Sequence, residues 1–310
     1  MAVVTGEPRL FRSAKAILGE SPVWDPAGDL LWCDIEGGTL HRSPLDGSVF
    51  GADDGVGNLG SPVPSFHPAS GGGFVVSLKN RVILIDETAR ETLELATLSH
   101  AHDGMRLNEG KVDPFGRWVT GSMDAESDSP AGIIYAIDTD GATTVLREGL
   151  SIPNGFEWTR DGSKMYFSDT ALETVFVGDY SLEGGLTNVE VFHEGESHDG
   201  MTMDAEGYLW GACYGAAKVV RYKPSGRQDH VINLPAPNIT SVAFGGAEMS
   251  TLFVTSAREN LSDAQLREFP MSGVLFSIDT STTGYLPRRF GEVTATPTSE
   301  STSPTAGAQS

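Results

Sequence analysis

The stretch Asp204-Ala-Glu-Gly207-Tyr-Leu-Trp-Gly-Ala212 places a turn containing glycine directly before a short apolar strand with an aromatic residue. Five similar stretches occur in the chain, with turns at Asp25–Gly28, His67–Gly71, Asp113–Gly116, Thr159–Gly162 and, more weakly, Phe244–Gly246. The last glycines of successive turns are 43, 45, 46, 45 and 39 residues apart. A period of about 40–50 residues with several short strands per unit is typical of a β-propeller.

A second turn lies in the outer half of most repeats. These turns are Pro44–Gly47, Asp138–Gly141, Ser181–Gly184 and Pro224–Gly226. Two hairpins per repeat make a blade of four antiparallel strands. The sequence therefore predicts an all-β fold in which residues 1–290 form one six-bladed β-propeller domain.

Two segments fall outside the strand pattern. Residues 262–269 are the only segment predicted as a helix, with Ser262 as its N-cap. Residues 291–310 are rich in Ser and Thr and have no apolar pattern to bury, so we predict a disordered C-terminal tail. Gly55-Val-Gly-Asn-Leu-Gly60 matches a dinucleotide-binding fingerprint by letter, but it lacks the flanking strand and helix and is predicted to be a loop.

Composition excludes several classes of partner. The 310 residues include 21 Lys and Arg against 42 Asp and Glu, a formal charge of −21 that repels nucleic acid phosphates and anionic lipid headgroups. We see no signal peptide and no apolar run long enough to span a bilayer, and expect a cytoplasmic protein with no membrane or nucleic acid partner. The two cysteines, Cys33 and Cys213, lie in blades that are not neighbours and are expected to be free thiols.

The polar residues of the innermost strands share one register. In a propeller these strands surround a central channel, so equivalent positions converge on the axis. Counting back eight residues from the turn glycine gives Glu20, Asn108, Asn154 and Asp199. The same count gives Val63 in the second repeat and, to within a residue or two, Asn238 in the sixth.

Two carboxylates and two amides on one axis supply oxygen ligands for a divalent cation. Without a cation, Glu20 and Asp199 would repel each other. Each side chain could instead cap a nearby backbone group, but a register shared by four repeats favours a metal site. The oxygen ligands suit Ca²⁺ first, with Mg²⁺, Mn²⁺, Zn²⁺ or Fe²⁺ as alternatives. His198 is expected at the rim, since neighbouring strand residues point in opposite directions.

Four motifs make the chain similar to a known family. They are Gly19–Trp24, Arg106–Arg117, Asn154–Gly162 and Asp199–Trp210. Together they resemble the SMP-30/gluconolactonase/luciferin-regenerating-enzyme family, and the resemblance runs from about residue 16 to 280. It implies a six-bladed propeller with one catalytic divalent cation.

The same resemblance assigns roles to individual residues. It implies that Glu20, Asn154 and Asp199 are metal ligands and that Arg106 and Asn108 contact the substrate, as Glu126 does in some members. Two residues depart from the family pattern. The usual Arg-x-Asn-Asp-Gly reads Arg106-Leu-Asn-Glu-Gly110, and His198 replaces the usual Pro before the ligand Asp.

The expected reaction is hydrolysis of an aldonolactone, such as gluconolactone or a pentonolactone, to the sugar acid. The metal would polarise the lactone carbonyl, and Asp199, or alternatively Glu20, would activate a water. Arg106 and Asn108 would orient the lactone. A metal-dependent esterase or phosphotriesterase of the same fold and a non-catalytic calcium-binding propeller remain alternatives. The expected partner is a small-molecule lactone, and the expected state is a monomer or weak homodimer.

Overall fold

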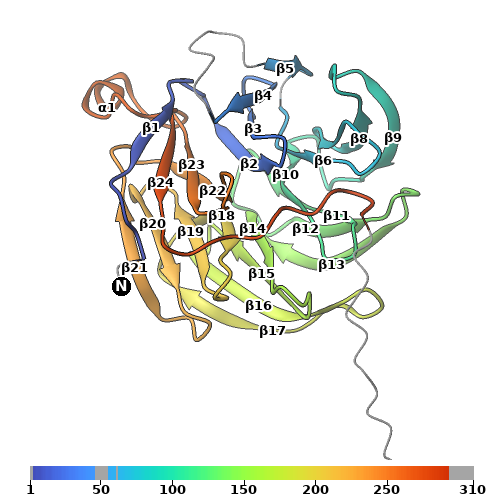
Figure 1. Ribbon diagram of the computed structural model, residues 1–310. Coiled ribbons are helices and arrows are strands. Elements are labelled where there is room, and N and C mark those ends of the chain that lie inside the picture. The colour runs from blue at the N-terminus through green and yellow to red at the C-terminus, as the bar shows by residue number, and fades with distance from the viewer. Residues whose placement is uncertain (1–2, 46–54, 61, 293–310) are drawn as a thin grey trace, which may run out of the picture.

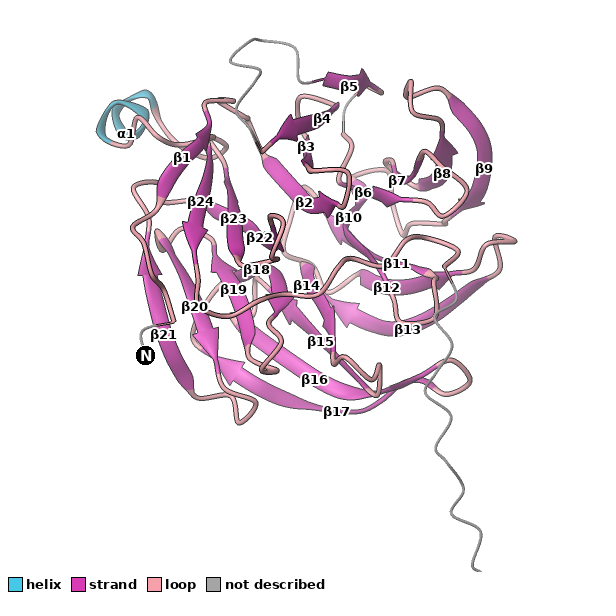
Figure 2. Ribbon diagram, viewed as in Figure 1, coloured by secondary structure: helices cyan, strands magenta, loops and turns pink. Residues whose placement is uncertain are grey.

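Six antiparallel sheets surround a common axis in the computed structural model, which describes residues 3–45, 55–60 and 62–292 (Figure 1). These residues contain 24 strands, in six sheets of four, and one short helix. Strands dominate the fold in Figure 2. The all-β, six-bladed β-propeller predicted from the repeat is confirmed.

Within the first five blades, the strands follow one another from the axis to the rim in sequence order. Blade 1 has β2 (Gly19–Asp25), β3 (Asp29–Asp34), β4 (Thr39–Pro44) and β5 (Gly55–Asn58). Blade 2 has β6 (Ser65–Pro68), β7 (Phe74–Ser77), β8 (Arg81–Ile85) and β9 (Glu91–Thr97). Blade 3 has β10 (Met105–Val112), β11 (Trp118–Asp124), β12 (Gly132–Ile137) and β13 (Thr143–Leu150). Blade 4 has β14 (Pro153–Trp158), β15 (Lys164–Asp169), β16 (Thr174–Ser181) and β17 (Gly185–Glu194). Blade 5 has β18 (His198–Met203), β19 (Leu209–Cys213), β20 (Lys218–Tyr222) and β21 (Gln228–Asn233).

Blade 6 combines both ends of the chain. Its inner strands are β22 (Ile239–Gly245), β23 (Thr251–Ser256) and β24 (Leu275–Asp279), and its outer strand is β1 (Arg9–Arg12). Leu10 pairs with Phe276 in the antiparallel β1–β24 ladder. The first strand of the sequence thus closes the ring, a contact that the repeat did not predict.

The inner turns explain the repeated glycines. Gly28, Gly116, Gly162 and Gly207 have φ between 73° and 113°, a region that favours glycine. The N–H of each donates to the carbonyl three residues earlier. In blade 2 this position belongs to Gly72, with φ of 89°, so the prediction of Gly71 is wrong by one residue within a run of three glycines.

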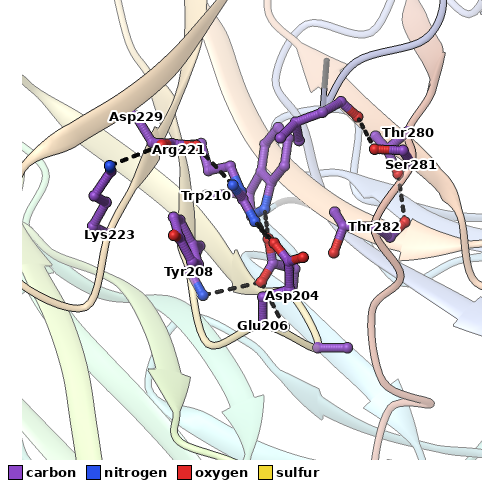
Figure 3. Close-up of polar contacts among 12 residues, drawn as sticks. Asp204, Glu206, Tyr208, Trp210, Arg221, Lys223, Asp229, Thr280, Ser281 and Thr282 are labelled. Atoms are coloured by element: carbon purple, nitrogen blue, oxygen red, sulfur yellow. Dashed lines mark hydrogen bonds and ion pairs between the residues drawn. The ribbon is translucent and has the colours of Figure 1, made fainter. Parts of the chain in front are cut away.

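The aspartate that opens several of these turns anchors a buried polar cluster. In blade 5, Arg221 Nη2 lies 2.6 Å from Asp204 Oδ2, and Trp210 Nε1 donates to the same oxygen at 2.9 Å (Figure 3). The Arg221 guanidinium also lies 3.7 Å from the Tyr208 ring centroid. In blade 3 the turn aspartate has different partners, because Arg117 Nε of the same turn and Tyr180 OH of β16 in blade 4 both donate to Asp113 Oδ2 at 2.8 Å. These contacts tie the turn of blade 5 to β20 and the turn of blade 3 to β16 of the neighbouring blade.

Other predictions from the sequence have mixed outcomes. The predicted helix forms as α1 (Asp263–Glu268), capped by Ser262 in a reciprocal contact with Gln265. Cys33 and Cys213 are free and buried, as predicted. The loop predicted at residues 55–60 is wrong, because residues 55–58 form edge strand β5. The predicted tail lies outside the described residues beyond position 292, and no helix in the described part is long and apolar enough to cross a membrane.

Residues 284–291, which we call the C-terminal strap, cross the turn end of the inner strands (Figure 1, dark red). Tyr285 OH donates to the carbonyl of Ala205 in blade 5 at 3.1 Å. Farther along, Phe290 N donates to Pro68 O in blade 2 at 2.9 Å. A cavity of about 1090 Å³ lies between the strap and the inner strands, lined by Trp24, Lys111, Glu157 and Met203, among others. Its lining includes none of Glu20, Asn108, Asn154 and Asp199, which lie toward the other end of these strands.

Candidate metal centre

A β-bulge interrupts the innermost ladder of five blades at nearly the same height. The register shifts after Glu20 in β2, Leu107 in β10, Asn154 in β14, His198 in β18 and Ile239 in β22. The four predicted axial residues therefore lie at the start of a bulge or one residue into it. The β6–β7 ladder of blade 2, which supplies no such residue, keeps a regular register. Bulges commonly re-aim side chains beside active sites.

The backbone at these bulges is tightly packed. Ser21 and Gly155, each following a predicted ligand, have φ of 48° and 58°. A Cβ at Gly155 would lie 2.5 Å from the carbonyl oxygen of Asp199, and one at Gly200 would lie 1.9 Å from Ser241 Oγ. The glycines next to the ligands thus let the inner strands of neighbouring blades approach each other closely.

A hydrogen-bonded chain joins the predicted amide residues. Arg106 Nη1 donates to Asn108 Oδ1 at 2.7 Å, and Asn108 Nδ2 donates to Asn154 Oδ1 at 3.0 Å. Asn154 Nδ2 in turn donates to Thr170 Oγ1 at 3.0 Å. The structure therefore brings Arg106, Asn108 and Asn154 together, and it adds Thr170, for which the repeat gives no signal.

The two predicted carboxylate ligands are buried and close enough to interact. Glu20 is 7% exposed and Asp199 is 8% exposed. Burial raises the pKa of Glu20 well above its usual value, and the charge of Asp199 raises it further. Burial also raises the pKa of Asp199, with the charge of Glu109 as the next cause. Arg106 is the cation that opposes both shifts.

Glu109, directly after Asn108, is a further carboxylate whose charge acts on Glu20 and Asp199, and the register count did not select it. Glu109 lines the cavity beneath the C-terminal strap, as Lys111 does, whereas Asn108 does not. Its charge raises the pKa of Glu20 and of Asp199. Burial raises the pKa of Glu109 itself, and the nearby Lys111 opposes that shift. The departure from the family's usual Asp thus lies beside the candidate ligands.

Polar groups of blades 5 and 6 lie near the same cluster. Asn238 Nδ2 donates to the carbonyl of Glu259 at 2.8 Å and to Tyr214 OH at 3.3 Å. Burial raises the pKa of the Glu259 carboxyl, whereas Arg106 lowers it. Burial also raises the pKa of Tyr214 to about 12, so its hydroxyl keeps its proton at neutral pH.

Two residues named from the sequence lie apart from the carboxylates. Glu126 is exposed in the loop after β11, and a Cβ at Gly104 would lie 2.7 Å from its Cδ. This places Glu126 near the strand of Arg106, but no contact with the candidate ligands is found in the described ranges. The prediction that His198 lies at the rim is wrong. Its ring is buried inside blade 5, where Nε2 lies 2.8 Å from Tyr222 OH and Nδ1 lies 3.6 Å from Cys213 Sγ.

The chemistry of this donor set fits a hard divalent cation. No group of three or more His, Cys, Asp or Glu side chains suited to a metal occurs in the described part of the chain. A site here would therefore combine the carboxylates of Glu20 and Asp199 with an amide oxygen. Thr170 engages the nitrogen of Asn154, which leaves Oδ1 on the side of Asn108. A cation would also relieve the repulsion between the two buried carboxylates.

Comparisons with known proteins agree with this fold. A family model described as SMP-30/Gluconolactonase/LRE-like region matches residues 18–258. The chain is 34% identical over 274 residues to regucalcin of Oryctolagus cuniculus, covering 84% of this chain and 90% of that protein. It is 32% identical over 269 residues to a 6-deoxy-6-sulfogluconolactonase of Pseudomonas putida, covering 84% and 91%. The crystal structure of a calcium-binding protein, regucalcin, from Agrobacterium tumefaciens str. C58 matches with a TM-score of 0.83, 29% identity, and coverage of 94% and 99%.

Proposed function

The chain belongs to the SMP-30/gluconolactonase/LRE-like family, and from this premise we propose that it is a divalent-metal-dependent lactonase that opens a sugar-derived lactone to the sugar acid. The observation that carries the proposal is the arrangement of Glu20, Asn154 and Asp199, with Arg106 bonded to Asn108 beside them. A site that only stored a cation would not need that guanidinium. Calcium is the preferred ion, because the ligands are all oxygens and a structural relative is a calcium-binding protein.

Glu20, Asn154 and Asp199 would hold the metal. When bound, the cation supplies a Lewis acid that polarises the lactone carbonyl. Arg106, at the end of the hydrogen-bonded chain, and Asn108, next to it, would orient the lactone.

Asp199 is the preferred base. Ser21 N donates to Glu20 Oε2 at 2.6 Å, whereas no hydrogen bond to the Asp199 carboxylate is found in the described ranges. Asp199 therefore has lone pairs available to accept a proton from water. The resulting hydroxide adds to the lactone carbonyl carbon, the ring C–O bond breaks, and the leaving oxygen takes the proton back from Asp199.

The first test is a panel of aldonolactones assayed by acid release. The protein is stripped with a chelator, and calcium, magnesium, manganese, zinc or ferrous iron is then added back singly. We expect lactone hydrolysis faster than the spontaneous rate only when a metal is added. The assay would then identify both the ion and the sugar lactone. Tight metal binding without turnover on any lactone would favour the calcium-binding propeller. Turnover of an organophosphate or aryl ester instead of a lactone would favour the esterase.

A matched pair of variants tests the assignment of the base. The tetrapeptide His-Asp-Gly-Met occurs at residues 102–105 and again at residues 198–201. Asp199→Ala is expected to lower kcat by at least about 100-fold, the lower end of what a general base contributes. Asp103→Ala changes an exposed loop residue in the same local sequence and should leave kcat unchanged. Full activity of the Asp199 variant with metal bound would refute the role.

A further inference from the structure

We propose that the Thr170 hydroxyl is a positioning residue for the candidate metal centre, because it holds the Asn154 amide in the one orientation that presents an oxygen to the channel. The inference rests on the proposed function, since it concerns how the chain prepares a ligand for the cation. Thr170 follows β15 of blade 4 directly, and neither the repeat nor the family motifs single it out.

The direction of each hydrogen bond follows from the atoms involved. Thr170 Oγ1 lies 2.7 Å from the backbone oxygen of His198. A carbonyl can only accept, so Thr170 gives its single hydroxyl proton to His198. The Thr170 oxygen is then left as an acceptor toward Asn154, and the atom of Asn154 that it faces at 3.0 Å must be the NH₂ group. Oδ1 of Asn154 therefore lies on the other side, where it accepts from Asn108.

This orientation matters because an asparagine amide is nearly symmetric in shape. Rotation of the amide by half a turn exchanges an acceptor for a donor at almost no steric cost. The rotated form would present NH₂, which cannot ligate a cation. Asn108 alone does not prevent this, because it is an amide of the same kind. Arg106 fixes the Asn108 amide by donating to its oxygen, and Thr170 fixes the Asn154 amide from the opposite side.

Thr170 is itself held rigidly. Its N–H donates to the carbonyl of Ile152 at 3.0 Å. The preceding residue, Asp169, accepts from Ser151 N at 2.8 Å and from Ile152 N at 3.1 Å. These bonds join the end of β15 to the segment that leads into β14 and Asn154. The hydroxyl also reaches across to blade 5, so it links Asn154 to the residue directly before Asp199. A hydroxyl on such a support can orient a ligand before the metal arrives.

Three variants separate this role from simple structural support. Thr170→Val keeps the shape and removes the hydroxyl, whereas Thr170→Ser keeps the hydroxyl. Ser168→Ala is the matched control, because Ser168 Oγ also donates to His198 O at 3.0 Å. Ser168 is the cross-strand partner of Asn154, but its hydroxyl makes no hydrogen bond to the Asn154 side chain among the described residues. We would measure the Kd of Ca²⁺ by calorimetry and that of Tb³⁺ by luminescence on chelator-stripped protein, together with the Tm of each variant.

Thr170→Val is expected to raise the metal Kd by about 10–100-fold, the range seen when outer-shell partners of metal ligands are removed. Thr170→Ser should restore most of the metal affinity lost in the valine variant, and Ser168→Ala should leave the metal Kd nearly unchanged. The Tb³⁺ emission lifetime in H₂O and D₂O should report about one additional bound water in the valine variant, because a lost protein ligand is replaced by solvent. An unchanged Kd in Thr170→Val, or an equal loss in Ser168→Ala, would overturn the inference.

A double-mutant cycle with Asn154→Asp provides a second, independent readout. A carboxylate has an oxygen at both ends, so its orientation no longer needs to be selected. The loss of metal affinity caused by Thr170→Val should therefore disappear in the Asn154→Asp background. Persistence of the full loss in that background would show that Thr170 acts in another way. Wild-type protein that binds neither ion would instead contradict the proposed function, and this inference would fall with it.

Discussion

At the residue scale, the candidate site places negative charge where the fold provides little to balance it. Glu20 and Asp199 are buried, their pKa values are raised by that burial, and Arg106 is the cation that opposes both shifts. The protein without metal therefore carries an electrostatic cost at the candidate site. Strained or destabilised functional sites of this kind are common in enzymes.

We predict that Asp199→Asn stabilises the metal-free protein. A folded pKa above the unfolded one means that the folded protein binds the extra proton. The stability that comes from binding this proton is fully present below the unfolded pKa of about 3.9, and it is lost as pH rises through the folded pKa. The variant should thus melt higher than wild type at pH 8 and almost equally at pH 3. Each kcal/mol gained raises Tm by about 2–4 °C in domains of this general size.

Thermal melts in chelator across this pH range would check the prediction. Asp103→Asn, at an exposed position, is the control and should not change Tm at either pH. A lower Tm for Asp199→Asn at pH 8 would mean that favourable contacts of the native carboxylate outweigh the free-energy cost of burying its charge.

The sequence predicted part of this site. Asn108 and Asn154 could be found by counting from the turn glycines, because each side chain keeps its distance from a turn. Glu109 could not be found in this way, because it lies one residue beyond the counted position and acts on the carboxylates through its charge. Thr170 could not be predicted from the sequence either, because its proposed role depends on contacts with Asn154 and with blade 5 that residue spacing does not show.

At the element scale, a buried ion pair between Arg221 and Asp204 holds the inner turn of blade 5 to strand β20. Arg221 is 2% exposed and Asp204 is 0% exposed, and Arg221 also contacts Glu206 and Asp229. Loss of one partner would leave an uncompensated buried charge, which is strongly destabilising. The aspartate of the repeated turn therefore contributes to stability, whereas the polar residue five positions before it serves the candidate site.

We predict that Arg221→Leu lowers the free energy of unfolding by about 3–5 kcal/mol, because it leaves the Asp204 carboxylate buried without its partner. Urea denaturation would measure the change. Arg9→Leu is the matched control, since Arg9 pairs with Asp279 at 2.8 Å but the two side chains are 60% and 44% exposed. Such exposed pairs contribute about 0–1 kcal/mol. Equal losses in the two variants would contradict the structural role of the buried cluster.

The C-terminal strap contributes to stability through one residue above all. Phe290 is 4% exposed and packs in the core beneath blades 2 and 3, whereas Leu286 of the same strap is 58% exposed. Phe290→Ala should lower stability by about 3–5 kcal/mol through lost burial and a cavity. Leu286→Ala should change stability by less than about 0.5 kcal/mol. Denaturation of both variants would test this, and a tolerated Phe290 variant would show that the strap is not docked.

The elements differ in how far the sequence could predict them. The six turns fixed the blade count because each inner hairpin needs a residue of positive φ at one place. Strand β5 was missed because its residues, Gly55 to Asn58, lack the apolar alternation of the inner strands. The pairing of β1 with β24 is a contact between the two ends of the chain, and a repeat within the sequence cannot predict such a contact.

At the scale of the whole molecule, charge should affect which lactones are used efficiently. The chain has a formal net charge of −21, so an anionic substrate is repelled as it approaches. We predict that kcat/KM for a lactone bearing a sulfonate or phosphate rises when salt is increased from about 0.01 to 0.15 M, as the Debye length falls from about 30 to 8 Å. A neutral lactone should show almost no change.

Steady-state assays at several salt concentrations with a neutral and an anionic lactone of the same ring would check this. The neutral lactone is the internal control, because it reports any effect of salt on the protein itself. An anionic lactone that is used better at low salt would contradict the prediction. It would show that positively charged side chains near the site attract the substrate more strongly than the net charge of the protein repels it.

The closure of blade 6 also has a consequence for how the protein is made. Arg9 and Asp279, which meet across the β1–β24 region, are 270 residues apart in the chain. At a translation rate of about 5–20 residues per second, β1 leaves the ribosome roughly 15–50 seconds before its partner exists. During that time β1 is a nascent strand with unpaired edges, open to pairing with other chains. The ring can close only near the end of synthesis, so ribosomes stalled before β24 should carry open, aggregation-prone propellers.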